Sequence, residues 1–127
     1  MTLKETLCQA LDQLGADSGD YQFDDHSTIV MSFDDVGDIY LDPRDGEQVW
    51  LWGMIEEVSE QARSVLAEPL LAEVIRPVGH WDAGAMVLRA DGRVGGMLHP
   101  EYVIEPSRLA EALQDFHECL ARMQAIR

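Results

Sequence analysis

Three short apolar segments within residues 26–54 constrain the fold of this chain more than any other feature. In the first segment every second residue is large and apolar, which is the period of a β-strand with two different faces. These residues are Ile29, Met31 and Phe33. Similar apolar residues recur in segments 39–41 and 49–52. The pattern predicts three consecutive strands of one sheet.

Turn-forming residues separate the second and third segments. Pro43 presets φ for a turn and Gly46 can adopt the positive φ that often closes one, so a turn is predicted over residues 42–46. The third segment, residues 49–52, is apolar on both faces and therefore needs cover on both sides. Helices of the same chain can cover one face. The other face requires a further surface.

Helical periodicity appears in three places. Residues 3–14 carry leucine at helical spacing and precede Gly15, which fits a helix C-terminus. A second helix is predicted over residues 56–75. Pro69 should kink or break this helix near Ala67-Glu68, because proline removes a hydrogen bond and clashes with the preceding turn.

The last helix is predicted to begin near Pro106, because proline is favoured in the first helical turn. One apolar seam runs along it, and His117 lies off that seam and is expected to face solvent. The seam consists of Leu109, Leu113, Phe116, Leu120 and Met123. The spacing is typical of a helix that packs on a sheet or on another helix.

A hairpin is predicted between segments 84–90 and 93–99, because Asp91-Gly92 is a strong two-residue turn signal. Gly95 inside the second strand marks a bulge or a close backbone approach, and Pro100 is expected to stop the strand. The element order is then α-βββ-α-ββ-α. This predicts an α+β fold in one domain over residues 1–127, with a mostly antiparallel, twisted sheet packed by helices.

Net charge restricts the partners. The chain has nine Lys and Arg against 24 Asp and Glu, a formal charge of −15. Phosphate backbones and anionic membranes would be repelled, so nucleic acid and membrane are not expected as partners. Basic protein segments are compatible with this surface, although a high net charge also simply keeps a protein soluble.

The sequence contains none of the common catalytic or phosphate-binding motifs. The aspartates of residues 16–25 do not match a calcium-binding loop, and Cys8 and Cys119 lack metal-ligand spacing. We therefore expect no enzyme activity, no cofactor and no metal. The cysteines are typical of a reducing compartment. No segment is apolar enough to span a membrane, so a soluble cytoplasmic protein is expected.

Two apolar surfaces exceed what a small core needs, although ordinary core packing would produce the same pattern. The third strand and the second helix could form a homodimer interface, because an isologous interface repeats one patch on both subunits. Its candidate residues are Trp50, Trp52, Val65, Leu66, Leu70 and Val74. The first helix and first strand could hold a peptide. The candidate residues of this groove are Leu7, Leu11, Leu14, Ile29, Met31 and Phe33.

Segments 26–30 (HSTIV), 49–52 (VWLW) and 98–100 (LHP) resemble those of the SpaK/InvB-like type III secretion chaperones, the small, acidic, multi-effector class IB. The resemblance implies a homodimeric α+β fold built around the second helix, where Pro69 departs from the expected pattern. It implies a bacterial cytoplasmic chaperone that binds N-terminal chaperone-binding segments of secreted effectors and keeps them secretion-competent. Such chaperones deliver cargo to the export apparatus, including its ATPase.

An alternative function follows from charge alone. An acidic immunity or inhibitor protein would mask the basic surface of one folded partner, whereas a chaperone would hold extended segments in apolar grooves. Salt distinguishes the two, because a charge-driven complex weakens strongly as ionic strength rises and an apolar complex weakens little.

Overall fold

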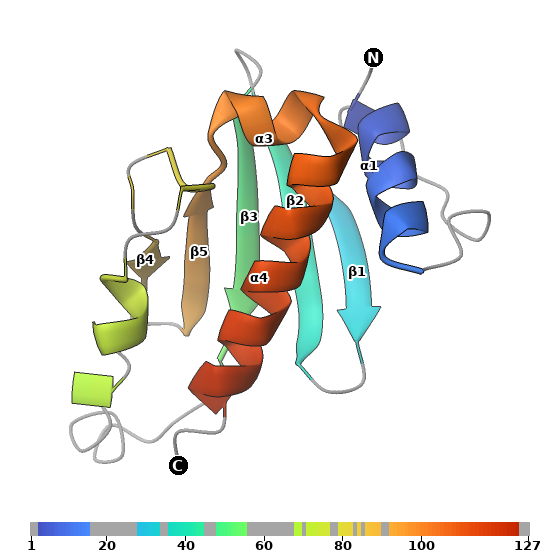
Figure 1. The fold of residues 1–127 in the computed structure, drawn as a ribbon. Helices are drawn as coiled ribbons and strands as arrows, with labels where there is room; N and C mark the ends of the chain where they lie inside the picture. Colours follow the sequence, from blue (N-terminus) through green and yellow to red (C-terminus); the bar gives the residue numbers. More distant parts are fainter. Residues whose placement is uncertain are drawn as a thin grey trace.

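The computed structural model describes most of the chain, namely residues 3–15, 28–33, 36–44, 48–55, 68–69, 71–76, 79–82, 84, 86–89 and 92–124. Its elements follow the predicted order with one addition (Figure 1). They are α1 (Leu3–Gln13), β1 (Ile29–Phe33), β2 (Gly37–Arg44), β3 (Gln48–Met54), β4 (Val87–Leu88), β5 (Arg93–Met97), α3 (Pro100–Ile104) and α4 (Pro106–Gln124). Residues 68–69 and 71–74 are also helical.

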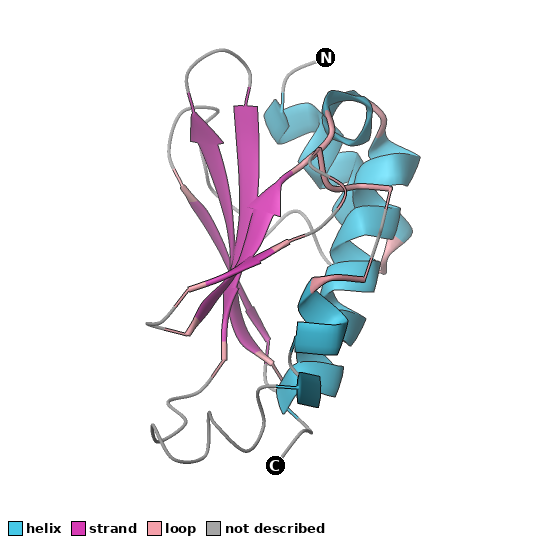
Figure 2. Ribbon diagram, turned by 90° about the vertical axis from the view of Figure 1, so that its left-hand side faces the viewer, coloured by secondary structure: helices cyan, strands magenta, loops and turns pink. Residues whose placement is uncertain are grey.

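The sheet has five strands in the order β1-β2-β3-β5-β4, and every pair is antiparallel. The described helices lie on one face of this sheet, and α4 crosses it lengthwise (Figures 1 and 2). The expected α+β fold with an antiparallel sheet is therefore confirmed. We call the opposite side of the sheet, which the described helices leave uncovered, the open face.

The core lies between the sheet and α4. Strand register brings the inward residues into rows across neighbouring strands, for example Ile29 opposite Leu41 and Leu41 opposite Leu51. The whole predicted seam of α4 is buried against these rows. Helix α4 lies close to β3, because a Cβ added at Gly53 would come within 2.6 Å of Leu120 Cδ1.

The predicted hairpin is present, with shorter strands. The Gly92 N–H donates to the Arg89 carbonyl oxygen at 3.0 Å, and Gly92 adopts a φ of +92°. Gly95 has a φ of +154°, and a Cβ there would overlap the Leu51 carbonyl oxygen. The glycine thus permits the close backbone approach that the sequence indicated.

One expectation about connections was wrong, and another was correct but incomplete. Residues 42–44 were predicted to form part of a turn, but Pro43 and Arg44 belong to β2 and pair with β3. Pro43 is tolerated because β1 pairs with β2 only as far as Leu41, so no second neighbour needs its missing N–H. Pro100 does not merely stop β5 but opens α3, whose first turn is capped by His99 Nδ1 accepting from the Glu101 N–H at 3.2 Å.

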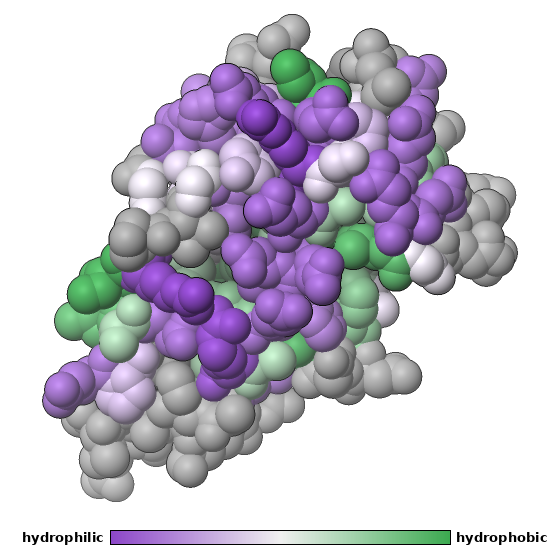
Figure 3. Space-filling view, in the orientation of Figure 1, coloured by the Kyte–Doolittle hydropathy of each residue, from purple (hydrophilic) through white to green (hydrophobic). Residues whose placement is uncertain are grey.

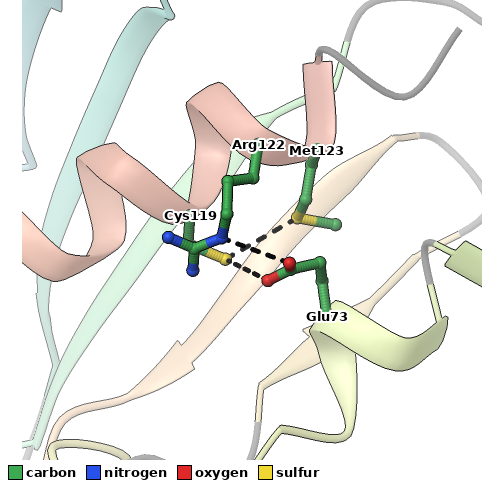
Figure 4. Close-up of polar contacts among 4 residues, drawn as sticks. All are labelled: Glu73, Cys119, Arg122 and Met123. Atoms are coloured by element: carbon green, nitrogen blue, oxygen red, sulfur yellow. Dashed lines mark hydrogen bonds and ion pairs between the residues drawn. The ribbon is translucent and has the colours of Figure 1, made fainter.

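The helical residues 71–74 are joined to α4 by polar contacts (Figure 4). Glu73 accepts a hydrogen bond from Arg122 Nε at 3.2 Å, and the Cys119 thiol lies 3.8 Å from its other carboxylate oxygen. This part of the predicted helix 56–75 is confirmed. Residues 56–67 and Leu70 lie outside the described residues, so the kink or break predicted near Ala67-Glu68 stays a prediction, although residues 68–69 themselves are helical.

Candidate binding groove

A groove of about 490 Å³ opens at one end of the helical layer. Four elements form it: the C-terminal end of α1, strand β1, one residue of β2 and one side of α4. The lining residues are Leu11, Gln13, Leu14, Gly15, Met31, Ser32, Phe33, Ile39, Leu113, Gln114 and His117. Figure 3 shows apolar surface gathered beside the end of α1 within a mainly hydrophilic surround.

Local periodicity explains why these side chains converge. Met31 and Phe33 are two residues apart in a strand and therefore project from the same face. Leu113 and His117 are four residues apart and lie on the same side of α4. Leu11 and Met31 are buried, whereas Leu14 is 39% and Phe33 36% exposed. The groove thus has a buried apolar floor and two large apolar side chains at its rim.

His117 belongs to this groove, although the sequence indicated a solvent-facing position. Its ring is half-buried and meets the Phe33 ring edge-on, with centroids 5.0 Å apart. The expectation was wrong because the seam of α4 was considered without β1, which approaches from the side. A signal was present in the sequence, since His117 follows the seam residue Leu113 by four positions.

The predicted peptide-binding residues fall into two groups. Leu11, Leu14, Met31 and Phe33 line the groove. Leu7 and Ile29 are buried in the core, at 0% and 3% exposed, and do not line it. Alternation and helical spacing identified the correct faces but not how deep each side chain lies on its face.

The groove differs in charge from the rest of the molecule. None of the described residues that line it is Asp, Glu, Lys or Arg, although the chain carries a net charge of −15. Its polar groups are side-chain amides, the His117 ring and Ser32, whose hydroxyl donates to Asp38 at 2.7 Å. Strand β1 is also an edge strand of the sheet. An extended chain could therefore pair with β1 and place apolar side chains in the groove.

The predicted dimer residues are not gathered on one surface. Val74 is partly buried against the core of its own chain, while Leu71 and Ile75 project outward at 55% and 61% exposed. Trp50 and Trp52 lie on the open face, the first half-buried and the second buried. Val65, Leu66 and Leu70 lie outside the described residues.

A second, much smaller cavity of about 20 Å³ has room for about one water molecule. It lies between α4 and the side chains of Glu73, Arg76, His80, Trp81 and Met86. His80 lines it with its Nδ1 3.9 Å from Asp115. Burial lowers the pKa of His80, and Asp115 partly opposes this. Burial and the neighbouring Glu73 raise the pKa of the Cys119 thiol to about 11, so the thiol is protonated at neutral pH. A protonated, buried thiol is a poor nucleophile.

The remaining chemistry of the described residues is limited. They contain no group of three or more His, Cys, Asp or Glu side chains placed to hold a metal ion. Over the same residues, no helix has the length and apolar character needed to cross a membrane. What the arrangement can do is bind an apolar, extended segment at the edge of the sheet.

An open antiparallel sheet with helices on one face and an uncharged groove at its edge defines a small α+β binding protein. The sequence model of the Invasion protein B family matches residues 15–92, which is more than half of the chain, and the chain belongs to this family. Membership confirms the resemblance to SpaK/InvB-like type III secretion chaperones and indicates a chaperone role in secretion. No curated protein sequence matches the chain significantly.

Proposed function

We propose that this protein is a cytoplasmic chaperone that binds the N-terminal chaperone-binding segments of type III secreted effectors as a homodimer. It keeps these segments soluble and competent for export, and hands them to the export apparatus with its ATPase. The observation that carries the proposal is the uncharged groove beside the edge strand β1. Family membership supports secreted effectors as the class of cargo.

An extended effector segment pairs with the outer edge of β1 through main-chain hydrogen bonds. Alternate side chains of an added strand point to the same face, so every second residue of the cargo enters the groove. The cargo side chains that enter the groove pack against Phe33 and Leu14 at its rim and against Leu113 on the opposite wall. Burying one large apolar side chain contributes about 1.5–3 kcal/mol, and part of this offsets the cost of ordering the segment.

The homodimer is proposed to form on the side of the molecule that carries β4. Leu71 and Ile75 lie four residues apart at the end of the second helix and are largely exposed, and Val87 and Leu88 of β4 are partly exposed. Apolar surface gathers on this side in Figure 3. An isologous contact would bury the same Leu71 and Ile75 side chains, together with part of the β4 edge, on both subunits. The contact between Glu73 and Arg122 holds the helix in the orientation that presents them.

The alternative, an acidic inhibitor of a basic partner, is supported by the net charge of −15. It makes the opposite prediction about where binding occurs. An inhibitor would use acidic side chains and would not need the uncharged groove.

The test compares two substitutions on the same strand. Phe33→Asp places a charge at the groove rim, whereas Val30→Asp places it on the opposite face of β1, where Val30 is 48% exposed. Each variant is co-expressed with the N-terminal region of a candidate effector, and co-purification is measured in low and high salt. Loss of cargo with Phe33→Asp only, and retention of wild-type cargo in high salt, is the expected result.

Two outcomes would reject the groove. Equal retention of cargo by both variants would place the cargo elsewhere. Dissociation of the wild-type complex as salt rises would favour the acidic inhibitor.

A further inference from the structure

The charge inside the groove depends on one side chain. None of the described residues that line it is Asp, Glu, Lys or Arg, and His117 is the one histidine among them. Histidine is the side chain that ordinarily changes its charge between pH 5 and pH 8. The described lining is therefore uncharged while this ring is neutral, and it gains one positive charge when the ring is protonated.

The His117 ring lies where cargo would cover it. The ring is half-buried and meets the Phe33 ring edge-on, with centroids 5.0 Å apart. Phe33 is 36% exposed at the groove rim, whereas Leu113, one turn earlier on α4, is buried in the wall. A cargo side chain that packs against Phe33 and Leu113 would therefore remove water that still reaches the His117 ring.

Covering the ring affects its two charge states differently. A neutral imidazole has an apolar body and packs against apolar groups at little cost. A protonated imidazole would lose its hydration, and burying a charge without a paired opposite charge is strongly unfavourable. The described lining of the groove offers no carboxylate for such a pair. Apolar cargo therefore binds the neutral ring in preference to the protonated one.

The charges around the groove act in the same direction. Strand β1, Ile29–Phe33, has no charged residue. On the other three elements, acidic residues directly adjoin lining residues in the sequence, and all of them are exposed; they are Asp12 on α1, Asp38 on β2, and Asp115 and Glu118 on α4. Asp38 accepts the hydrogen bond from Ser32, and Asp115 lies 3.9 Å from His80. Exposed carboxylates attract a protonated ring toward solvent and so favour the empty groove.

We propose that His117 makes the groove a pH-dependent binding site, which holds an apolar segment while the ring is neutral and releases it when the ring is protonated. The proposal rests on the proposed chaperone function and adds a means of cargo release to it. A histidine that must be neutral in the complex lowers the affinity about tenfold between pH 7.5 and pH 5.5, because about nine-tenths of ordinary histidine side chains are charged at the lower pH.

A second histidine responds to the same range of pH. His80 lines the smaller cavity beside Asp115, and burial lowers its pKa. Protonation of His80 would destabilise the whole fold and so weaken cargo binding indirectly. Substitutions at the two histidines therefore separate release at the groove from loss of the folded state.

The experiment uses the full chain and an acetylated, amidated dodecapeptide in which Leu and Ser alternate. This peptide has no titratable group, so a change of affinity with pH comes from the protein. Calorimetry at pH 7.5 and pH 5.5 gives the two dissociation constants, and circular dichroism verifies that the protein is folded at both. The expected result is binding about tenfold weaker at pH 5.5, with release of a proton on binding near pH 6. Buffers of different ionisation enthalpy detect that proton.

Two variants remove the titrating ring in different ways. His117→Gln keeps a polar side chain, and His117→Phe keeps an aromatic ring beside Phe33. Either variant should bind the peptide equally at the two pH values, whatever its affinity at pH 7.5. The matched control is His80→Gln, the same substitution at a histidine that does not line the groove. It should retain the tenfold difference.

Loss of the groove and loss of its pH dependence give different results. Binding that Phe33→Asp abolishes, but that is equally tight at both pH values or weakens equally in the His117 variants, would overturn the proposal and leave the groove in place. Affinity that rises as the pH falls would overturn it too, because the protonated ring would then recognise an acceptor in the peptide. No binding at pH 7.5, or binding that Phe33→Asp does not weaken, would reject the groove and with it this role of His117.

Discussion

Gly95→Ala tests how closely β5 and β3 approach. Two costs add at this position. A φ of +154° belongs to a region that is accessible essentially only to glycine, and a side chain held in such a region costs about 1–3 kcal/mol. The new Cβ would also overlap the Leu51 carbonyl oxygen, and forcing extra atoms into a packed site costs about 1–3 kcal/mol. We expect a total loss of roughly 2–6 kcal/mol, a large part of the roughly 5–15 kcal/mol that stabilises a typical domain.

Gly37→Ala is the matched control. Gly37 also has a positive φ, +80°, but nothing lies within 4 Å of the position its Cβ would take. Only the left-handed backbone penalty of about 1–2 kcal/mol should apply. Urea denaturation monitored by circular dichroism gives both free energies of unfolding. Equal losses in the two variants, or a loss below about 1 kcal/mol in Gly95→Ala, would refute the close approach as the reason for this glycine.

Three further predictions use the described side chains. Leu71→Asp together with Ile75→Asp should convert a dimer to a monomer in light scattering with unchanged circular dichroism; a persistent dimer would exclude this surface. Burial lowers the pKa of His80, and the nearby charge of Asp115 raises it by a smaller amount, so the folded state favours the neutral ring. Stability should therefore be complete above pH 6.5 and fall as the pH drops below it; a His80→Gln variant with the same pH dependence would disprove the assignment. Cys119, with its pKa raised to about 11, should react with iodoacetamide far more slowly than the partly exposed Cys8 in the native protein; mass spectrometry identifies the modified peptide, and faster labelling of Cys119 would contradict its burial.

Much of the sheet could be predicted because its signals are local. Asp91-Gly92 indicated the hairpin, and the alternation of Ile29 and Met31 indicated the buried face of β1. The short helix α3 was missed because its cap is unusual: His99 accepts through its ring nitrogen, whereas Ser, Thr, Asp and Asn are the common N-cap residues. Pro100 was then interpreted only as a strand terminator, although proline also fits the first turn of a helix.

The candidate sites were harder to predict because they depend on tertiary neighbours. The correct faces of α1 and β1 were identified, but Leu7 lies too deep to line the groove, and depth depends on α4, more than 90 residues further along the chain. From the sequence, a second subunit was expected to cover Trp50. Part of it is Arg44 of the same chain, and nothing in the sequence pattern places that guanidinium on the ring.

Because the described helices cover only one face of the sheet, substitutions on the two faces of β3 are constrained in different ways. Val49, Leu51 and Gly53 face α4, where volume is limited and Leu120 leaves no room for a larger residue at Gly53. Trp50 and Trp52 face away from α4, beneath the guanidinium groups of Arg44 and Arg89. A lineage could therefore vary the residues of the open face through alternate codons of one strand, while the intervening codons preserve the packing beneath.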